Sequence, residues 1–168
     1  MKKIISLFIF LLLLVGCSLS NSPTSKVEEL LGKYQMLDND IQSGISDILK
    51  EENLNDTQKD RYQKIIEKQY KNLTYQVKDE RVDGDTAIIT TEIEVTDFKK
   101  IVNEVNAQYQ GSNDYTVEEY NNTKLDKLEK AKDKVTYTIE FEVKKDKNGN
   151  WKLSSLSNET IKKIQGMY

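Results

Sequence analysis

The hydrophobic residues of this chain follow three patterns in succession. Residues 4–15 form an apolar run that only Ser6 interrupts. From Lys26 onward, apolar residues recur every three or four positions, which is typical of one face of an amphipathic helix. Beyond Lys71, several segments alternate apolar and polar residues, which is typical of strands with one buried face. The pattern therefore predicts an apolar leader followed by a domain of helices and strands.

The first part of the domain is predicted to be helical. One amphipathic helix is expected over residues 26–48, with Ser25 as its N-cap and a kink allowed by Gly32 and Gly44. A second helix is expected over residues 56–71. The residues expected to face inward from this second helix are Tyr62, Ile65, Ile66, Gln69 and Tyr70.

The strands are predicted from the alternating segments and the turns between them. Residues 73–95 read as a hairpin around Asp83-Gly84, and residues 135–143 form the clearest half-buried strand. Asn148-Gly149 then turns the chain into a short final strand. We expect an α+β domain in which an antiparallel sheet of about four strands is covered on one side by helices.

Further helices are predicted between and after the strands. Asp97 precedes a segment of helical spacing, and Thr116 and Glu119 have the spacing of a capping box, so each marks the start of a helix. A short last helix is expected with Asn158 as its cap. The segment 98–132 is thus predicted to be a helical insertion between strands.

The first 17 residues have the features of an exported leader. Two lysines precede an apolar run of 12 residues, which is shorter than the roughly 20 residues of a membrane-spanning helix, so residues 1–16 are predicted to be a signal peptide. The sequence Leu14-Val15-Gly16-Cys17 resembles the lipobox of bacterial lipoproteins. The resemblance implies that Cys17 receives a thioether-linked diacylglyceryl group and that cleavage falls between Gly16 and Cys17. The alternative is that Cys17 is a small residue near an ordinary cleavage site.

This leader gives a prediction of organisation and location. We expect a signal peptide over residues 1–16, a lipidated tether over 17–25 and one extracytoplasmic domain over 26–168. Two acyl chains such as palmitate anchor a protein stably because each buried methylene contributes about 0.8 kcal/mol. The expected location is the cell membrane, on its extracytoplasmic face, with the membrane as partner through the lipid on Cys17.

Composition and charge exclude several kinds of chemistry. The chain has 25 basic and 28 acidic residues, and its formal charge of −3 becomes −5 once the lysines at positions 2 and 3 leave with the leader, which argues against nucleic-acid binding. It has no histidine, so Ser-His, Cys-His and histidine-rich zinc sites are excluded. It has one cysteine, so no internal disulfide forms. No metal and no cofactor are expected.

Three short segments resemble the NTF2-like, or cystatin-like, superfamily of small cone-shaped domains. They are Lys33-Tyr34-Gln35 in the first helix, Asp83-Gly84-Asp85 before the second strand, and the segment 148–152 that ends in Trp151-Lys152. In some relatives, carboxylates and tyrosines in the mouth of the cone perform isomerase chemistry. The residues here that the resemblance places in a possible pocket are Tyr34, Asp38, Tyr62, Tyr70, Tyr75, Tyr109 and Trp151.

These observations lead to one expected function and two alternatives. We expect a noncatalytic binding or interaction domain, whose concave face or helical insertion contacts a small apolar ligand or another envelope protein. The first alternative is an isomerase-like enzyme in which a desolvated Asp38 acts as base. Against it, aromatic residues at helical or alternating spacing are usually core. The second alternative is a structural lipoprotein of the cell envelope.

Overall fold

A computed structural model describes residues 21–111 and 114–168. The predicted signal peptide, the lipobox and Cys17 lie outside these residues, so those predictions stay predictions. The described elements, in chain order, are α1 (Pro23–Met36), α2 (Asn39–Glu51), α3 (Asp56–Lys71), β1 (Thr74–Asp83), β2 (Thr86–Thr96), α4 (Phe98–Tyr109), α5 (Val117–Lys130), β3 (Lys134–Lys145), β4 (Trp151–Leu153) and α6 (Asn158–Ile164).

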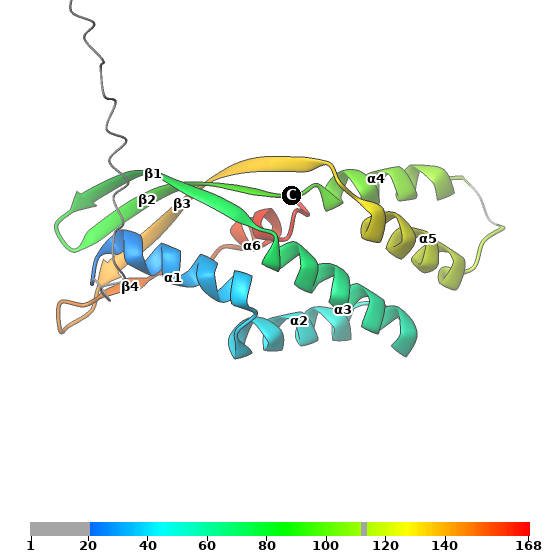
Figure 1. Cartoon of the computed structure of the whole chain (residues 1–168), viewed down its shortest axis with the longest axis horizontal. Coiled ribbons are helices and arrows are strands. Elements are labelled where there is room, and N and C mark those ends of the chain that lie inside the picture. Colours follow the sequence, from blue (N-terminus) through cyan, green and yellow to red (C-terminus); the bar gives the residue numbers. More distant parts are fainter. Residues whose placement is uncertain (1–20, 112–113) are drawn as a thin grey trace, which may run out of the picture.

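The four strands form one antiparallel sheet in the order β1-β2-β3-β4. The sheet curves over α1 and α6, which lie on one side of it (Figure 1). On this side, β2 buries five alternating residues, and Ile89 faces Phe141 of β3 in register. The other side carries exposed or half-buried residues such as Glu92 and Glu140. The predicted α+β class, with a sheet of about four strands covered on one side, is confirmed.

The hairpin turns occur where the sequence predicts them. Gly84, with φ 58°, connects β1 to β2, and Gly149, with φ 79°, connects β3 to β4. Both residues adopt the left-handed conformation, in which glycine has no steric penalty from a side chain.

The predicted first helix is two helices, and it begins earlier than expected. Ser22 is the N-cap of α1 and Pro23 is its first residue, so the predicted cap, Ser25, is instead the third helical residue and completes a capping box with Ser22. Proline suits the first position of a helix because its missing N–H has no partner there in any case. The helix thus takes in the last three residues of the predicted tether.

The break between α1 and α2 occurs at Leu37 and Asp38. Leu37 has φ 52°, in the left-handed region, and the Asp38 carboxylate accepts a hydrogen bond from the Ile41 N–H at 3.0 Å as the N-cap of α2. Leu37 is nevertheless buried, so the apolar spacing runs through the break. The two glycines at which a kink was allowed lie inside helices, where they cause no break.

The caps of the later helices are confirmed with one exception. Asp97 accepts from the Lys100 N–H, and Thr116 forms the predicted capping box with Glu119. The prediction for the last helix is wrong by one residue, because Ser157 is the cap and Asn158 is the first helical residue. All five residues predicted to face inward from α3 are buried.

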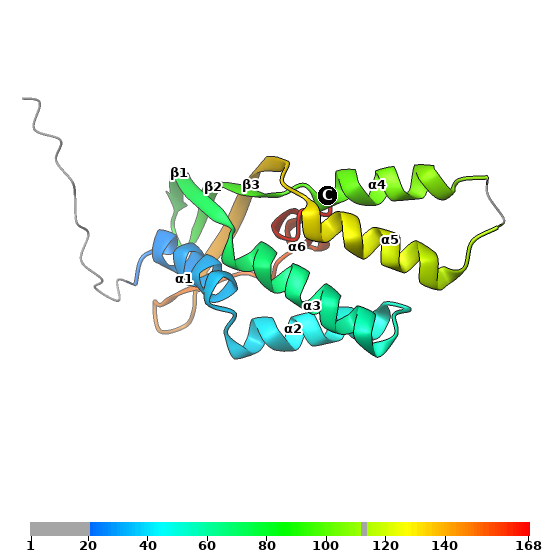
Figure 2. The same cartoon turned by 45° about the vertical axis from the view of Figure 1, so that its right-hand side comes forward.

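The helices α4 and α5 connect β2 to β3 and extend beyond the end of the sheet (Figures 1 and 2). We call this pair, with the described residues between the helices (98–111 and 114–130), the helical arm. At its base, the Asp97 N–H donates to the Asp133 carbonyl oxygen at 2.9 Å. At the opposite end of the molecule, the side chain of Asn21 accepts from the Trp151 N–H at 2.9 Å. The start of α1 and the helical arm lie at opposite ends of the long axis (Figure 1).

Candidate functional site

The seven residues of the predicted pocket do not share one cavity. Tyr34 and Tyr70 are both buried, and their rings meet edge to face with centroids 4.9 Å apart. Burial raises the pKa of Tyr70 to about 12. Tyr62 and Tyr70 both line a cavity of only about 20 Å³, which has room for little more than one water. These three tyrosines are core residues.

Asp38 has a structural position at the start of α2. Besides capping this helix, its carboxylate lies 3.9 Å from the Lys33 ammonium, and 29% of the side chain remains exposed. It lines none of the cavities described here. The desolvated carboxylate among tyrosines that the isomerase alternative requires is not formed by this arrangement.

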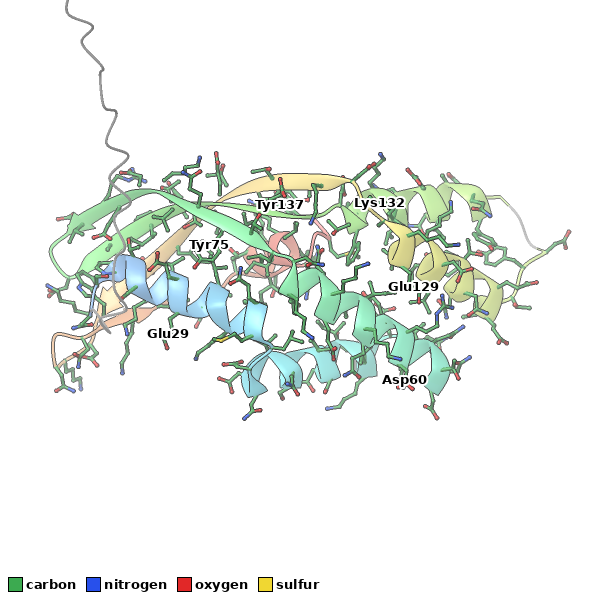
Figure 3. All side chains as sticks on the ribbon, viewed as in Figure 1. Glu29, Asp60, Tyr75, Glu129, Lys132 and Tyr137 are labelled. Atoms are coloured by element: carbon green, nitrogen blue, oxygen red, sulfur yellow. The ribbon has the colours of Figure 1, made fainter. Side chains whose placement is uncertain are left out.

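The remaining three predicted pocket residues are far from one another. Tyr75 is half-buried on β1, in the sheet (Figure 3). Trp151 is buried on β4, with the Lys145 ammonium 4.9 Å from the centre of its ring. Tyr109 ends α4, on the helical arm. The seven residues are thus divided between the core, the sheet and the arm.

The structure shows instead a groove of about 220 Å³ between α3 and α5. Its apolar floor is made by Ile65 of α3, Phe98 at the start of α4 and Leu128 of α5, all of them buried. Its rims are formed by Lys64 and Lys68 on one side and by Glu129 on the other. We call this feature the α3–α5 groove. The sequence prediction did not include it.

An ion-pair network joins the two helices at one end of the groove. The guanidinium of Arg61 donates to Glu129 at 2.9 Å and to Asp126 at 2.6 Å. Figure 3 shows Glu129 on α5 above α3. The hydrogen bonds from Arg61 lower the pKa of Glu129, and the two carboxylates raise the pKa of Arg61. The charge of Arg61 is therefore already matched within the protein.

The other cations of the groove have no such partner. Lys64 and Lys68 are one helical turn apart, and both are exposed. Among the residues that the structure describes, neither ammonium lies within 4.0 Å of a carboxylate or makes a hydrogen bond. Asn72, one turn further along, continues this polar edge. The groove thus combines an apolar floor with two unpaired positive charges.

The inner end of the groove is a fixed junction of three segments. The buried amide of Gln69 donates to the Thr96 carbonyl oxygen at 2.9 Å and accepts from the Thr96 N–H at 3.0 Å. It also donates to the carbonyl oxygen of Gln165, beyond α6, at 3.3 Å. Gly166 packs so closely that an added Cβ would lie 2.1 Å from the Thr96 oxygen. The walls of the groove are therefore held in place without a ligand.

A second surface feature is the tip of the helical arm. The ring of Tyr109 lies 4.5 Å from that of Tyr115 and 5.5 Å from that of Tyr120, centroid to centroid. Tyr115 and the neighbouring Val117 are 40% and 57% exposed. We call these three rings the tyrosine tip. It is flanked by two shallow hollows of about 350 and 430 Å³.

Neither a metal-binding cluster of side chains nor a membrane-spanning helix occurs among the described residues. Over residues 21–111 and 114–168, no group of three or more acidic, histidine or cysteine side chains is arranged to hold a metal ion. Over the same ranges, no helix has the length and apolar character needed to cross a membrane.

Comparisons with known proteins add little to this picture. No protein-family model matches the chain, and no curated protein matches it. Among solved structures, the chain is similar to a Bacillus subtilis protein called a "putative lipoprotein (ycdA)", with 20% sequence identity and a TM-score of 0.44. The match covers 76% of this chain and 45% of that one, so this chain corresponds to less than half of the Bacillus protein. A similarity of this degree carries no argument about fold or function, and the NTF2-like resemblance stays a prediction.

Proposed function

We propose that this protein is a membrane-anchored lipoprotein with a noncatalytic, extracytoplasmic binding domain. The observation that carries the proposal is the sequence Leu14-Val15-Gly16-Cys17 directly after an apolar run of 12 residues. A thiol at this position is the acceptor for a diacylglyceryl group, and two acyl chains give stable anchoring where one gives only marginal binding.

The geometry of the domain is consistent with an anchor at this end. Cys17 precedes the first residue of α1 by six positions, and the start of α1 lies at the end of the molecule opposite the helical arm (Figure 2). A lipid on Cys17 attaches the domain to the membrane near this end, and the arm lies at the other end. The arm carries the tyrosine tip and one wall of the α3–α5 groove, which are the two surfaces best suited to contact a ligand or an envelope partner.

The test is metabolic labelling of the full chain with an alkyne analogue of palmitate, followed by separation of membrane and soluble fractions. We expect the unaltered protein to be labelled and to sediment with membranes, and Cys17→Ser to lose the label. Ser18→Ala is the matched control and should behave as the unaltered protein does. Unlabelled, soluble protein in the culture medium would refute the proposal.

A separate experiment tests on which side of the membrane the domain lies. Protease added to spheroplasts, from which the cell wall and any outer membrane have been removed, should degrade an extracytoplasmic domain, whereas a cytoplasmic reporter protein in the same spheroplasts should survive. Protection of this chain under those conditions would contradict the proposed location.

A further inference from the structure

The α3–α5 groove has the apolar and charged lining of a ligand site, and its own side chains do not fill it. We propose that it binds a small anionic amphiphile, a carboxylate joined to a short apolar chain. The carboxylate lies at Lys64 and Lys68, and the apolar chain lies on Phe98 and Leu128. The inference rests on the proposed function only in treating the domain as a binding module, because the groove does not depend on the anchor.

The charge of the occupant follows from the pairing of the basic residues around the groove. Arg61 is bound to Glu129 and Asp126, so it is not available to a ligand. Lys64 and Lys68 have no partner among the described residues, although the chain as a whole has an excess of acidic residues. Two ammonium groups one helical turn apart attract a carboxylate and repel a cation.

The apolar part of the occupant follows from the floor and the size of the groove. Ile65, Phe98 and Leu128 present carbon surface between the two rims. A volume of about 220 Å³ is below the 300 to 1,000 Å³ typical of pockets for drug-sized ligands. A short acyl chain suits this space better than a long lipid or a polypeptide segment.

The groove is also preformed, which lowers the entropic cost of binding. The ion pairs of Arg61 fix α3 against α5, and the amide of Gln69 fixes α3 against the end of β2. The competing hypothesis is that Lys64 and Lys68 are both solvated and that Lys68 merely interacts favourably with the C-terminal end of α3. The two hypotheses differ in whether the lysines affect binding of a carboxylate.

The experiment uses the full-length protein in nanodiscs of neutral phosphatidylcholine, with octanoate that carries a terminal trifluoromethyl group as the probe. Binding is followed by fluorine NMR, with empty nanodiscs as the reference for uptake into lipid. We expect saturable binding to the unaltered protein. The double variant Lys64→Gln/Lys68→Gln should weaken it about fivefold to tenfold, because each exposed ion pair contributes up to about 1 kcal/mol.

Two controls separate charge from shape. Lys147→Gln/Lys162→Gln makes the same change in net charge at exposed lysines outside the groove and should alter affinity less than about twofold. Ala131→Leu should weaken binding by filling the groove, which Ala131 lines. Thermal melting of each variant checks that it is folded.

Three results would overturn the inference. The first is that the unaltered protein and Lys64→Gln/Lys68→Gln bind the carboxylate probe with equal affinity. The second is that the unaltered protein binds the corresponding trifluoromethyl alcohol as tightly as the carboxylate. The third is that the protein shows no saturable binding beyond that of empty nanodiscs. If the protein proves to be soluble, the same titration is done in buffer. A failure of the anchor and a failure of the groove are therefore observed independently.

Discussion

A buried hydroxyl in the centre of the sheet gives a sharp test of the packing. Thr91 lies on the inner side of β2, in register with Val77 on β1 and Ile139 on β3, and none of its surface is exposed. Its Oγ1 has no hydrogen-bond partner among the described residues. A buried polar group without a partner costs about 1 to 3 kcal/mol. Thr91→Val replaces the hydroxyl by a methyl group of nearly the same shape.

We expect Thr91→Val to raise the free energy of unfolding by about 1 to 2 kcal/mol, since it removes this cost and adds apolar surface to the core. For a domain of this size, each kcal/mol corresponds to about 2 to 4 °C in the melting temperature. Urea denaturation of the full chain, followed by circular dichroism, measures the change. The matched control is Thr90→Val on the other side of the same strand, which should change stability by less than about 0.5 kcal/mol.

The opposite result would refute the reasoning. If Thr91→Val lowers stability by about 1 kcal/mol or more while Thr90→Val is neutral, the Thr91 hydroxyl makes a stabilising hydrogen bond, for example to a buried water.

Three further predictions concern other parts of the domain. Gly166→Ala should destabilise by about 2 kcal/mol or more in urea denaturation, because the added carbon meets the Thr96 oxygen at 2.1 Å and the residue has φ 69°; unchanged stability would contradict the close packing. Asp38→Ala should cost about 1 kcal/mol of unfolding free energy and Asp38→Asn much less, because asparagine is an equally good N-cap; equal losses would argue for a role beyond capping. The pKa of Glu129 is lowered in the folded protein, so its pairing with Arg61 stabilises the fold above the ordinary pKa of 4.5, and this contribution is lost as the pH falls through the pKa of the folded state. The melting temperatures of the unaltered protein and Glu129→Gln should therefore converge between neutral and acid pH. A difference in melting temperature that does not change with pH would contradict this.

Local signals in the sequence were sufficient for most elements of the fold. The caps at Asp97 and Thr116 were predictable because each depends on a local hydrogen bond, in which the capping side chain accepts from the N–H group three residues later. The strand over residues 135–143 was predictable because strict alternation of apolar and polar residues suits a half-buried strand and does not suit one face of a helix. The break at Leu37 was not predictable, because this apolar residue continues the helical spacing across the break. Its left-handed conformation does not change the pattern of apolar and polar residues.

The candidate site was less predictable than the fold. The predicted pocket grouped aromatic residues by type, although helical spacing placed Tyr62 and Tyr70 in the core. The floor of the α3–α5 groove joins Ile65, Phe98 and Leu128, which come from three helices, so no short motif contains it. The sequence shows Lys64 one helical turn from another lysine, but only the three-dimensional arrangement shows that both lack a partner.

The way in which the arm joins the sheet has a consequence for how this chain can diverge. Both ends of the arm meet at neighbouring positions, with the Asp97 N–H bonded to the Asp133 oxygen, and β2 and β3 pair along their whole length. Related chains can therefore lengthen, shorten or replace the insertion while the four-stranded scaffold survives. The helix α5 supplies one wall of the groove but is not part of the sheet. Substitutions in α5 can therefore change the ligand preference while the sheet stays the same.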